Sequence, residues 1–236
     1  MIQRSAVIAG LLGLLAGGGA VALATGTLTS DPERARIEEV VRAYILDHPE
    51  ILPEAMQRLQ DKELAKVVDA NREAFETPFA GAWAGAEDGD VVLVEFFDYA
   101  CGFCRKSNED IDRLLAEDPN LKVVWRELPV LGPDSNAAAQ ASLTAAKQGK
   151  FRPFYNALFA EGRPTPDAIA AAQKAAGVTP APATPAMESE IQKNYQLAGA
   201  ARGSGTPIFI VGDKVLHGAV GYDALKAAIA EARASS

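Results

Sequence analysis

The sequence is poor in cysteine and histidine, with only two of each among 236 residues. Both cysteines, Cys101 and Cys104, fall within one four-residue window, which excludes a framework of structural disulfides. A disulfide between them closes too short a loop to add much stability. Two cysteines cannot complete a tetrahedral zinc site, and neither His48 nor His217 has a second ligand at a suitable spacing. We therefore expect no zinc site and interpret both histidines as structural or surface residues.

Clustered positive charge is also missing. The formal net charge is −8, and no group of Lys and Arg suggests a surface that binds phosphates. This excludes nucleic acid as the expected partner. With 48% hydrophobic and 23% charged residues, the chain has an ordinary globular balance, enough for one sizeable core and an accessory element.

Residues 1–24 have the pattern of a signal peptide. Arg4 precedes an apolar run from Ala6 to Ala24, which ends in a small-x-small cleavage pattern. An uncleaved membrane anchor is the main alternative, because the run is close to the length that spans a bilayer. A buried cytosolic helix is the third. The first two alternatives both place the remaining chain outside the cytoplasm.

Residues 31–75 are expected to form helices. Asp31 and Pro32 provide an N-cap and a proline at the first helical position, and apolar residues then recur at helical spacing. Pro49 predicts a bend near His48. A helical pair of this size cannot bury its own apolar stripe. We therefore expect this segment to pack on the main domain or on another copy of the chain, giving a homo-oligomer.

The rest of the chain predicts an α/β domain at residues 91–236, after a connector at 76–90. Val91 to Phe97 and Leu121 to Glu127 are typical of buried strands, with a helix between them. A helical block without strands spans about residues 133–201, and a hairpin and a last helix follow. This order indicates a thioredoxin-like fold with a helical insertion.

The cysteine pair forms the motif Cys101-Gly102-Phe103-Cys104, directly after a predicted strand and at the start of a predicted helix. A thiol at a helix N-terminus is stabilised as the thiolate by free amides and by the helix dipole. Cys104 lies one turn further on, where it can attack a mixed disulfide formed by Cys101. This context favours redox chemistry. The alternatives are a Cu(I) carrier that uses the same two sulfurs, and a purely structural pair.

Glu95 lies six residues before Cys101 on an apolar strand. Burial of an acid is costly, so we interpret Glu95 as an acid/base that relays the proton of Cys104, directly or through a water molecule. The alternative is a strand residue that faces solvent.

Thr206 and Pro207 precede the predicted strand Ile208–Val211, a position where proline is tolerated. A cis peptide here, placed against the cysteines, would let Thr206 offer its backbone to an incoming peptide as an added strand. Most X–Pro bonds are trans, so the residues alone leave the isomer open.

These motifs, namely residues 94–104, residues 205–212 and the helical insertion, resemble the DsbA-like branch of the thioredoxin superfamily. Residues 41–52 resemble the oligomerisation segment of copper-sensitivity-suppressor C (ScsC) proteins. The resemblance implies a cis Thr206–Pro207 bond, a nucleophilic Cys101 and a resolving Cys104, with Glu95 and Pro207 in support. It also implies a periplasmic protein that needs no cofactor, acts on cysteine-containing proteins and has a redox partner in the membrane.

The dipeptide between the cysteines departs from the commonest family pattern. Gly102-Phe103 replaces the Pro-His of the strongest oxidants and so lacks an imidazole that could stabilise the thiolate. Gly-aromatic dipeptides, and Thr before the proline, are more similar to periplasmic isomerases. We therefore expect isomerase-like exchange, with a DsbA-type disulfide oxidase as the alternative.

Overall fold

The computed structural model describes residues 32–235. It divides the chain into two units, with the boundary between Gln57 and Arg58. The expected signal peptide at residues 1–24 lies outside the described residues. Among residues 32–235, no helix is both long enough and apolar enough to cross a membrane.

The N-terminal segment consists of helices α2 (Pro32–Asp47), α3 (Ile51–Ala70) and α4 (Arg72–Glu76). The break between α2 and α3 falls at His48–Glu50, where the sequence predicts a bend. No residue of α2 is buried in the chain, whereas Leu64 of α3 is buried and Val68 and Phe75 pack into a core cluster of the second unit. The unit boundary therefore falls inside the segment 31–75, and the part from Arg58 onward belongs to the second unit.

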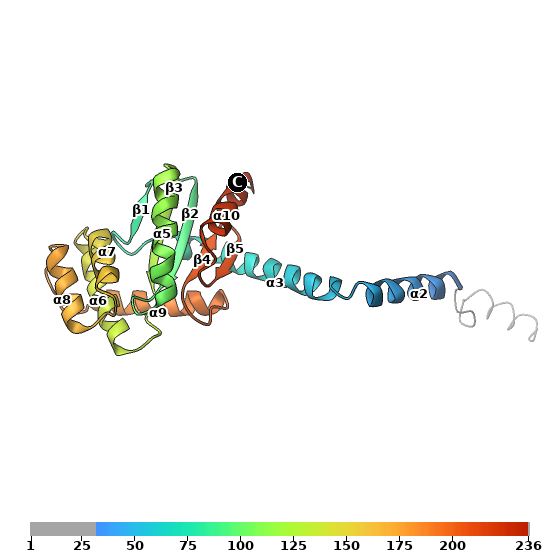
Figure 1. Cartoon of the computed structure of the whole chain (residues 1–236), viewed down its shortest axis with the longest axis horizontal. Helices are drawn as coiled ribbons and strands as arrows, with labels where there is room; N and C mark the ends of the chain where they lie inside the picture. The colour runs from blue at the N-terminus through green and yellow to red at the C-terminus, as the bar shows by residue number, and fades with distance from the viewer. Residues whose placement is uncertain (1–31, 236) are drawn as a thin grey trace, which may run out of the picture. The chain divides into compact units, whose positions relative to one another are not determined.

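The second unit is built on a five-stranded sheet with the order β1-β3-β2-β4-β5 (Figure 1). Its strands are β1 (Trp83–Gly85), β2 (Val91–Phe97), β3 (Leu121–Glu127), β4 (Ile208–Val211) and β5 (Lys214–His217). The central pair β2–β3 is parallel, and the other pairs are antiparallel. The strands β2, β3 and β4 have the bounds that the sequence predicts, and the thioredoxin-like fold is confirmed.

Six helices complete the second unit. They are α5 (Gly102–Glu117), α6 (Pro133–Lys147), α7 (Phe151–Glu161), α8 (Pro166–Ala175), α9 (Pro185–Ala200) and α10 (Tyr222–Ser235). Helices α6 to α9 form the helical insertion between β3 and β4. Their alanine-rich sequence lets them pack closely, because small side chains allow the helix backbones to approach one another.

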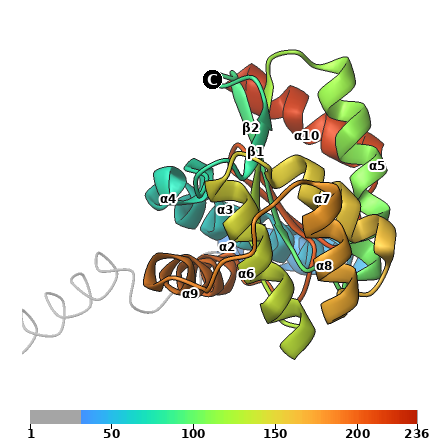
Figure 2. The same cartoon turned by 90° about the vertical axis from the view of Figure 1, so that its left-hand side faces the viewer.

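The two faces of the sheet have separate cores. Leu93, Phe97 and Trp125 pack with residues of α5, α6, α7, α8 and α10, while Val94 and Phe96 pack with residues of α3, α4 and α9. Figure 2 shows α5 and α10 on one side of the strands and α4 on the other. Because successive residues of a strand point to opposite faces, Glu95 belongs to the face that carries Leu93 and Phe97. That is also the face covered by α5, so Glu95 lies on the side of the cysteines.

Strand β1 is not predicted by the sequence. The segment 76–90, expected as a connector, contains this three-residue edge strand, which pairs with β3. Gly85 ends the strand with φ +91°, and a Cβ there would lie 2.1 Å from the carbonyl oxygen of Leu121. The glycine is therefore required for the close approach of the connector to β3.

Candidate active site

The two cysteines lie where β2 passes into helix α5. Cys101 is the N-cap residue of α5, and Cys104 lies in its first turn. Both are free thiols, but their exposure differs: Cys101 is 6% exposed and Cys104 is fully buried. Of the two residues, only Cys101 retains any exposed surface. Phe103, between them, is 66% exposed.

The position at the helix N-terminus separates the two thiols chemically. A hydrogen bond from Cys104, the Thr206 side chain and the backbone amides of Phe103 and Cys104 lower the pKa of Cys101 to about 5, against the opposing effect of burial. Burial and the contact with Cys101 raise the pKa of the Cys104 thiol far above its ordinary value. At neutral pH, Cys101 is the thiolate and Cys104 keeps its proton.

Thr206 lies directly against Cys101. The Cys101 thiol is 3.3 Å from the backbone carbonyl oxygen of Thr206, and the Thr206–Pro207 peptide bond is cis. The Thr206 carbonyl can accept a hydrogen bond only from the protonated thiol of Cys101, so this contact favours the thiol over the thiolate. The hydrogen bonds that stabilise the Cys101 thiolate outweigh this contact, and the pKa of Cys101 is lowered. The structure thus joins two motifs that the sequence separates by 105 residues.

Glu95 is completely buried, with a relative exposure of 0%. Burial raises its pKa to about 8, and this outweighs the lowering by Tyr155, Trp125 and Arg152. Its charge in turn raises the pKa of Cys104, which places the two groups within electrostatic reach. Glu95 is therefore neutral at pH 7 and does not face solvent.

One hydrogen-bond partner of Glu95, and the residue that this partner also binds, are not among the sites that the sequence predicts. Tyr155, from α7 in the helical insertion, lies with its hydroxyl 3.3 Å from Glu95 Oε2, and the same hydroxyl is 2.6 Å from Asn108 Oδ1. Asn108 lies one helical turn after Cys104, so the i, i+4 spacing could have suggested it. Nothing in the sequence relates position 155 to position 95.

Trp125 is a second neighbour of Glu95. It lies opposite Glu95 in the β2–β3 register and is 2% exposed. Its indole Nε1 and Glu95 Oε1 have no hydrogen bond of standard geometry in the described part of the chain. Trp125 nevertheless lowers the pKa of Glu95, so the indole N–H is close enough to interact with the carboxyl group.

Asp98 connects the cysteine loop to the loop after β3. One carboxylate oxygen accepts a hydrogen bond from the Ala100 amide at 2.8 Å, and the other from the Leu131 amide at 2.9 Å. The backbone carbonyl of Asp98 also accepts from the Cys101 amide at 2.9 Å. These three bonds hold the approach to Cys101 in one conformation.

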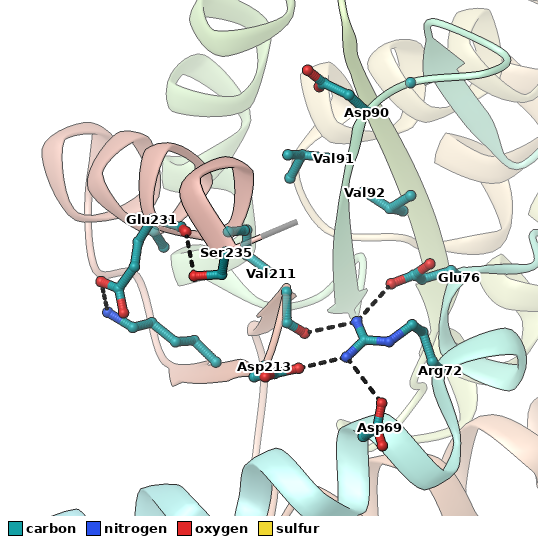
Figure 3. A pocket seen from close by; sticks show the side chains of 15 residues that line it. Asp69, Arg72, Glu76, Asp90, Val91, Val92, Val211, Asp213, Glu231 and Ser235 are labelled. Carbon is teal, nitrogen blue, oxygen red and sulfur yellow. Dashed lines mark hydrogen bonds and ion pairs between the residues drawn. The ribbon is translucent and has the colours of Figure 1, made fainter.

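A separate cavity of about 460 Å³ lies at the opposite end of β2, around Val91 and Val92. Figure 3 shows the Arg72 guanidinium directed between three carboxylates there. Arg72 Nη2 is 2.5 Å from Asp213 and 3.6 Å from Asp69, and Nη1 is 3.3 Å from Glu76. The guanidinium offsets part of the negative charge of these carboxylates. Residues 32–235 contain no group of three or more His, Cys, Asp or Glu side chains suited to a metal.

A thioredoxin-like sheet with a thiolate-forming cysteine at the start of α5 and a cis-proline loop against it defines the class of dithiol redox proteins. The comparisons agree. Residues 92–230 match the DSBA-like thioredoxin domain, and residues 33–66 match the copper resistance protein ScsC N-terminal domain. The chain belongs to the DsbA-like thioredoxin domain family, and it also carries an ScsC N-terminal domain.

Solved structures show the same relationship. A periplasmic thioredoxin-like protein from Salmonella enterica serovar Typhimurium is 31% identical, with a TM-score of 0.65 over 69% of this chain and 95% of that one. A thioredoxin-like oxidoreductase from Silicibacter pomeroyi is 34% identical, with a TM-score of 0.67 over 70% and 99%. A linker-deletion mutant of Proteus mirabilis ScsC is 26% identical, with a TM-score of 0.71 over 89% and 99%.

The curated relatives are larger proteins. The Na(+)/H(+) antiporter NhaA 3 of Salinispora tropica is 30% identical over 161 residues, which make up 64% of this chain and 24% of the antiporter. The NhaA 1 antiporter of Salinispora arenicola is 29% identical over 173 residues, again 24% of its length. The chain thus spans about a quarter of the length of the curated relatives it matches.

Proposed function

We propose that this protein is a thiol–disulfide oxidoreductase that exchanges disulfides with cysteine-containing protein substrates through Cys101 and Cys104. One observation carries the proposal: Cys101 has a lowered pKa and keeps some exposed surface, while Cys104, one turn further into the helix, is fully buried and has a raised pKa. A nucleophile and a resolving thiol need this division of properties.

The exchange proceeds by two displacements. The Cys101 thiolate attacks one sulfur of a substrate disulfide, forms a mixed disulfide and releases the other substrate sulfur as a thiolate, which takes up a proton. Cys104 then loses its proton, attacks Cys101 and releases the second substrate thiolate. The substrate gains two electrons and the Cys101–Cys104 pair is oxidised; the reverse sequence oxidises a substrate dithiol.

Glu95 serves as the acid/base for Cys104 in this proposal. A buried thiol with a raised pKa cannot be an effective nucleophile until a nearby base takes its proton. Glu95 is the buried carboxyl group within electrostatic reach of Cys104, and its pKa of about 8 allows it to exchange a proton near neutral pH.

Thr206 and Pro207 would position the substrate. The Thr206 backbone lies beside the Cys101 sulfur at the entrance to β4. An extended substrate chain can therefore pair with this backbone as an added strand and bring its own sulfur in line with Cys101.

We further propose an isomerase-like role rather than that of a strong oxidant. Gly102-Phe103 offers no imidazole to stabilise the thiolate, and a less stabilised thiolate makes a less oxidising disulfide. The proposal also includes self-association through the N-terminal helices. Large apolar side chains of the first unit are between 50% and 65% exposed, namely Ile37, Val40, Val41, Tyr44, Leu46 and Leu52. Several dithiols facing one client would favour the shuffling of its disulfides.

The periplasm is the proposed location, with a membrane protein as redox partner. The support is the likeness to periplasmic thioredoxin-like and ScsC proteins, together with the signal-peptide pattern of residues 1–24.

A scrambled-disulfide refolding assay tests the proposed function. We expect the mature protein to restore activity to scrambled ribonuclease, and a variant lacking residues 25–57 to lose most of this activity while still reducing a small disulfide. Deletion up to Gln57 spares the buried Leu64, and it spares Val68 and Phe75, which pack into the core of the second unit. The Cys101→Ser variant is the inactive control. Equal isomerisation by both proteins would contradict the role of the helices, and failure of both to exchange any disulfide would contradict the function.

A further inference from the structure

The Tyr155 hydroxyl lies between two acceptors and has one proton to donate. It is 2.6 Å from Asn108 Oδ1 and 3.3 Å from Glu95 Oε2. Burial raises the pKa of Tyr155 well above its ordinary value, so the hydroxyl keeps its proton throughout the working range. The shorter contact is the better hydrogen bond, so the proton of Tyr155 is directed at Asn108 in this structure.

This arrangement fits one protonation state of Glu95. A neutral carboxyl group can donate its own O–H to the Tyr155 oxygen, whereas a carboxylate can only accept. If Glu95 ionises, the Tyr155 hydrogen must turn from Asn108 to the carboxylate, because no other hydrogen bond of standard geometry reaches Glu95 in the described residues. Asn108 and ionised Glu95 therefore compete as acceptors for the one hydroxyl hydrogen of Tyr155.

We propose that Tyr155 and Asn108 are positioning residues that decide how readily Glu95 gives up its proton, with Asn108 acting through the Tyr155 hydroxyl. The proposal rests on the proposed role of Glu95 as the acid/base for Cys104. It assigns a function to the helical insertion, because Tyr155 comes from α7 and completes a site whose other groups come from the sheet and from α5.

The protons balance through the reaction. When a substrate thiolate attacks Cys101 in the oxidised pair, the Cys101–Cys104 bond breaks and Cys104 leaves with the electron pair. Cys104 takes the proton of Glu95, and the Tyr155 O–H rotates from Asn108 to the new carboxylate. In the reverse step, Glu95 recovers the proton of Cys104 and the Tyr155 O–H returns to Asn108. Neither Tyr155 nor Asn108 gains or loses a proton.

Other charged and titratable groups act on Glu95 but do not depend on this switch. Arg152 lowers the pKa of Glu95, and its guanidinium is held 2.5 Å from Asp112 by an ion pair. The remaining groups are the thiols of Cys101 and Cys104, the buried Tyr99 and the buried Glu127. All of these stay in place when only Asn108 or the Tyr155 hydroxyl is changed.

The test follows the Glu95 carboxyl carbon by ¹³C NMR against pH in the reduced full-length protein, with Glu95→Gln to assign the signal. Asn108→Ala frees the Tyr155 hydroxyl to donate to the carboxylate, so the pKa of Glu95 should fall by about half a unit to one unit. Tyr155→Phe removes the donor, so that pKa should rise by about one unit. The double variant should match Tyr155→Phe alone.

Tyr195→Phe is the matched control, because the half-buried Tyr195 donates its hydroxyl hydrogen to the Pro129 carbonyl at 2.6 Å instead. This variant should leave the pKa of Glu95 unchanged. The proposal would be overturned if the pKa of Glu95 is unchanged or raised in Asn108→Ala. It would also be overturned if Asn108→Ala still shifts the pKa of Glu95 when Tyr155 is replaced by Phe. The direction of the Glu95 pKa shift in Asn108→Ala tests the proposal by itself, even if Tyr155→Phe folds poorly.

The rate of mixed-disulfide resolution by Cys104 provides the functional readout. Its pH midpoint should move in the direction of the Glu95 pKa in each variant. If the NMR shifts occur but the resolution rate does not follow them, the switch exists and the proposed role of Glu95 is wrong. If the NMR shifts do not occur, the switch itself is wrong, whatever Glu95 does in exchange.

Discussion

The sulfur of Cys101 lies 3.3 Å from the carbonyl oxygen of Thr206, across a separation of 105 residues. The contact joins the start of helix α5 to the entrance of strand β4. Because β4 pairs with β2, the strand that leads into the cysteine motif, the sheet itself fixes this distance. The same sheet register places Glu95 beside Trp125 on the face below the cysteines.

The low pKa of Cys101 predicts how the reaction rate depends on pH. With a pKa of about 5, Cys101 is ionised across the neutral range, so mixed-disulfide formation should slow only as the pH falls below about 5. The thiolate absorbance near 240 nm in the reduced protein, measured against pH, checks the titration, and Cys104→Ser isolates the signal of Cys101. A Cys101 pKa near the ordinary value of about 8.5 would contradict the prediction.

The same shift predicts a pH-dependent stability of the reduced protein. A thiol with a lowered pKa in the folded state binds fewer protons than in the unfolded state, so it stabilises the fold above the unfolded-state pKa. That contribution should diminish as the pH falls from about 9 towards 5. Urea unfolding of the reduced protein across this range checks it, and Cys101→Ser should remove the effect.

Glu95 should destabilise the fold at high pH. Its pKa is raised to about 8, so between about pH 4.5 and 8 the folded state holds a proton that the unfolded state has lost. The free energy of unfolding therefore falls with rising pH over this interval. Glu95→Gln should remove this dependence and stabilise the protein relative to wild type at pH 8, by up to about 4 kcal/mol.

Equilibrium denaturation of the wild type and of Glu95→Gln at pH 4.5 and pH 8 measures how the free energy of unfolding depends on the charge of Glu95. Glu127→Gln is a useful comparison, because burial also raises the pKa of this carboxyl group. It should stabilise the fold at high pH, and it should change the resolution step less than Glu95→Gln does, because Glu127 acts on that step only through its charge interaction with Glu95. A stability difference between Glu95→Gln and wild type that is the same at both pH values would contradict the assigned pKa.

Arg126 should be essential for stability. It is 1% exposed, and its guanidinium donates to the carbonyls of Ala74, Phe75 and Thr77 at the end of α4, and to Glu190 and Asn194 of α9. Arg126→Met removes all five of these hydrogen bonds at once and leaves the buried acceptors on Phe75 and Asn194 without this partner, at an expected cost of about 3–5 kcal/mol. Denaturant unfolding measures it. Arg113→Met removes an exposed ion pair with Glu117 instead and should cost about 1 kcal/mol or less.

Phe103 provides a test of the redox role. Its side chain is 66% exposed, so Phe103→His should be accommodated without repacking and place an imidazole beside the Cys101 sulfur. A further stabilised thiolate makes the disulfide more oxidising, and we expect the reduction potential to rise by about 30 mV, a tenfold change in the equilibrium constant. Titration against glutathione measures it, with Phe103→Leu as the control. An unchanged potential would show that this dipeptide does not set the redox role.

The chemistry-bearing residues could be predicted from the sequence because each lies in a short motif. Cys101 and Cys104 follow an apolar strand and open a helix, and Glu95 is an acid inside that strand. A local sequence pattern is sufficient to predict such features. Helix and strand patterns also placed most of the elements correctly. The strand β2 is buried on both faces and is therefore apolar apart from Glu95.

Features that depend on tertiary contacts could not be predicted. Strand β1 has three residues and no periodicity of its own, and only its pairing with β3 defines it. Arg126 and Tyr155 have ordinary sequence surroundings, and their roles arise from packing against α4 and against Glu95. The division of the segment 31–75 at Gln57 follows from the burial of Leu64, Val68 and Phe75, which helical periodicity alone does not distinguish from self-association.

The contact between Cys101 and Thr206 also imposes an order on biosynthesis. A chain that has emerged only as far as α9 already contains both thiols, but it lacks the strand that brings Thr206 to Cys101. Such an intermediate has the cysteines without the surface that aligns a substrate chain beside them. Under the proposed function, full reactivity is acquired only when β4 and β5 have joined the sheet, so the protein completes its own folding before it acts on that of others.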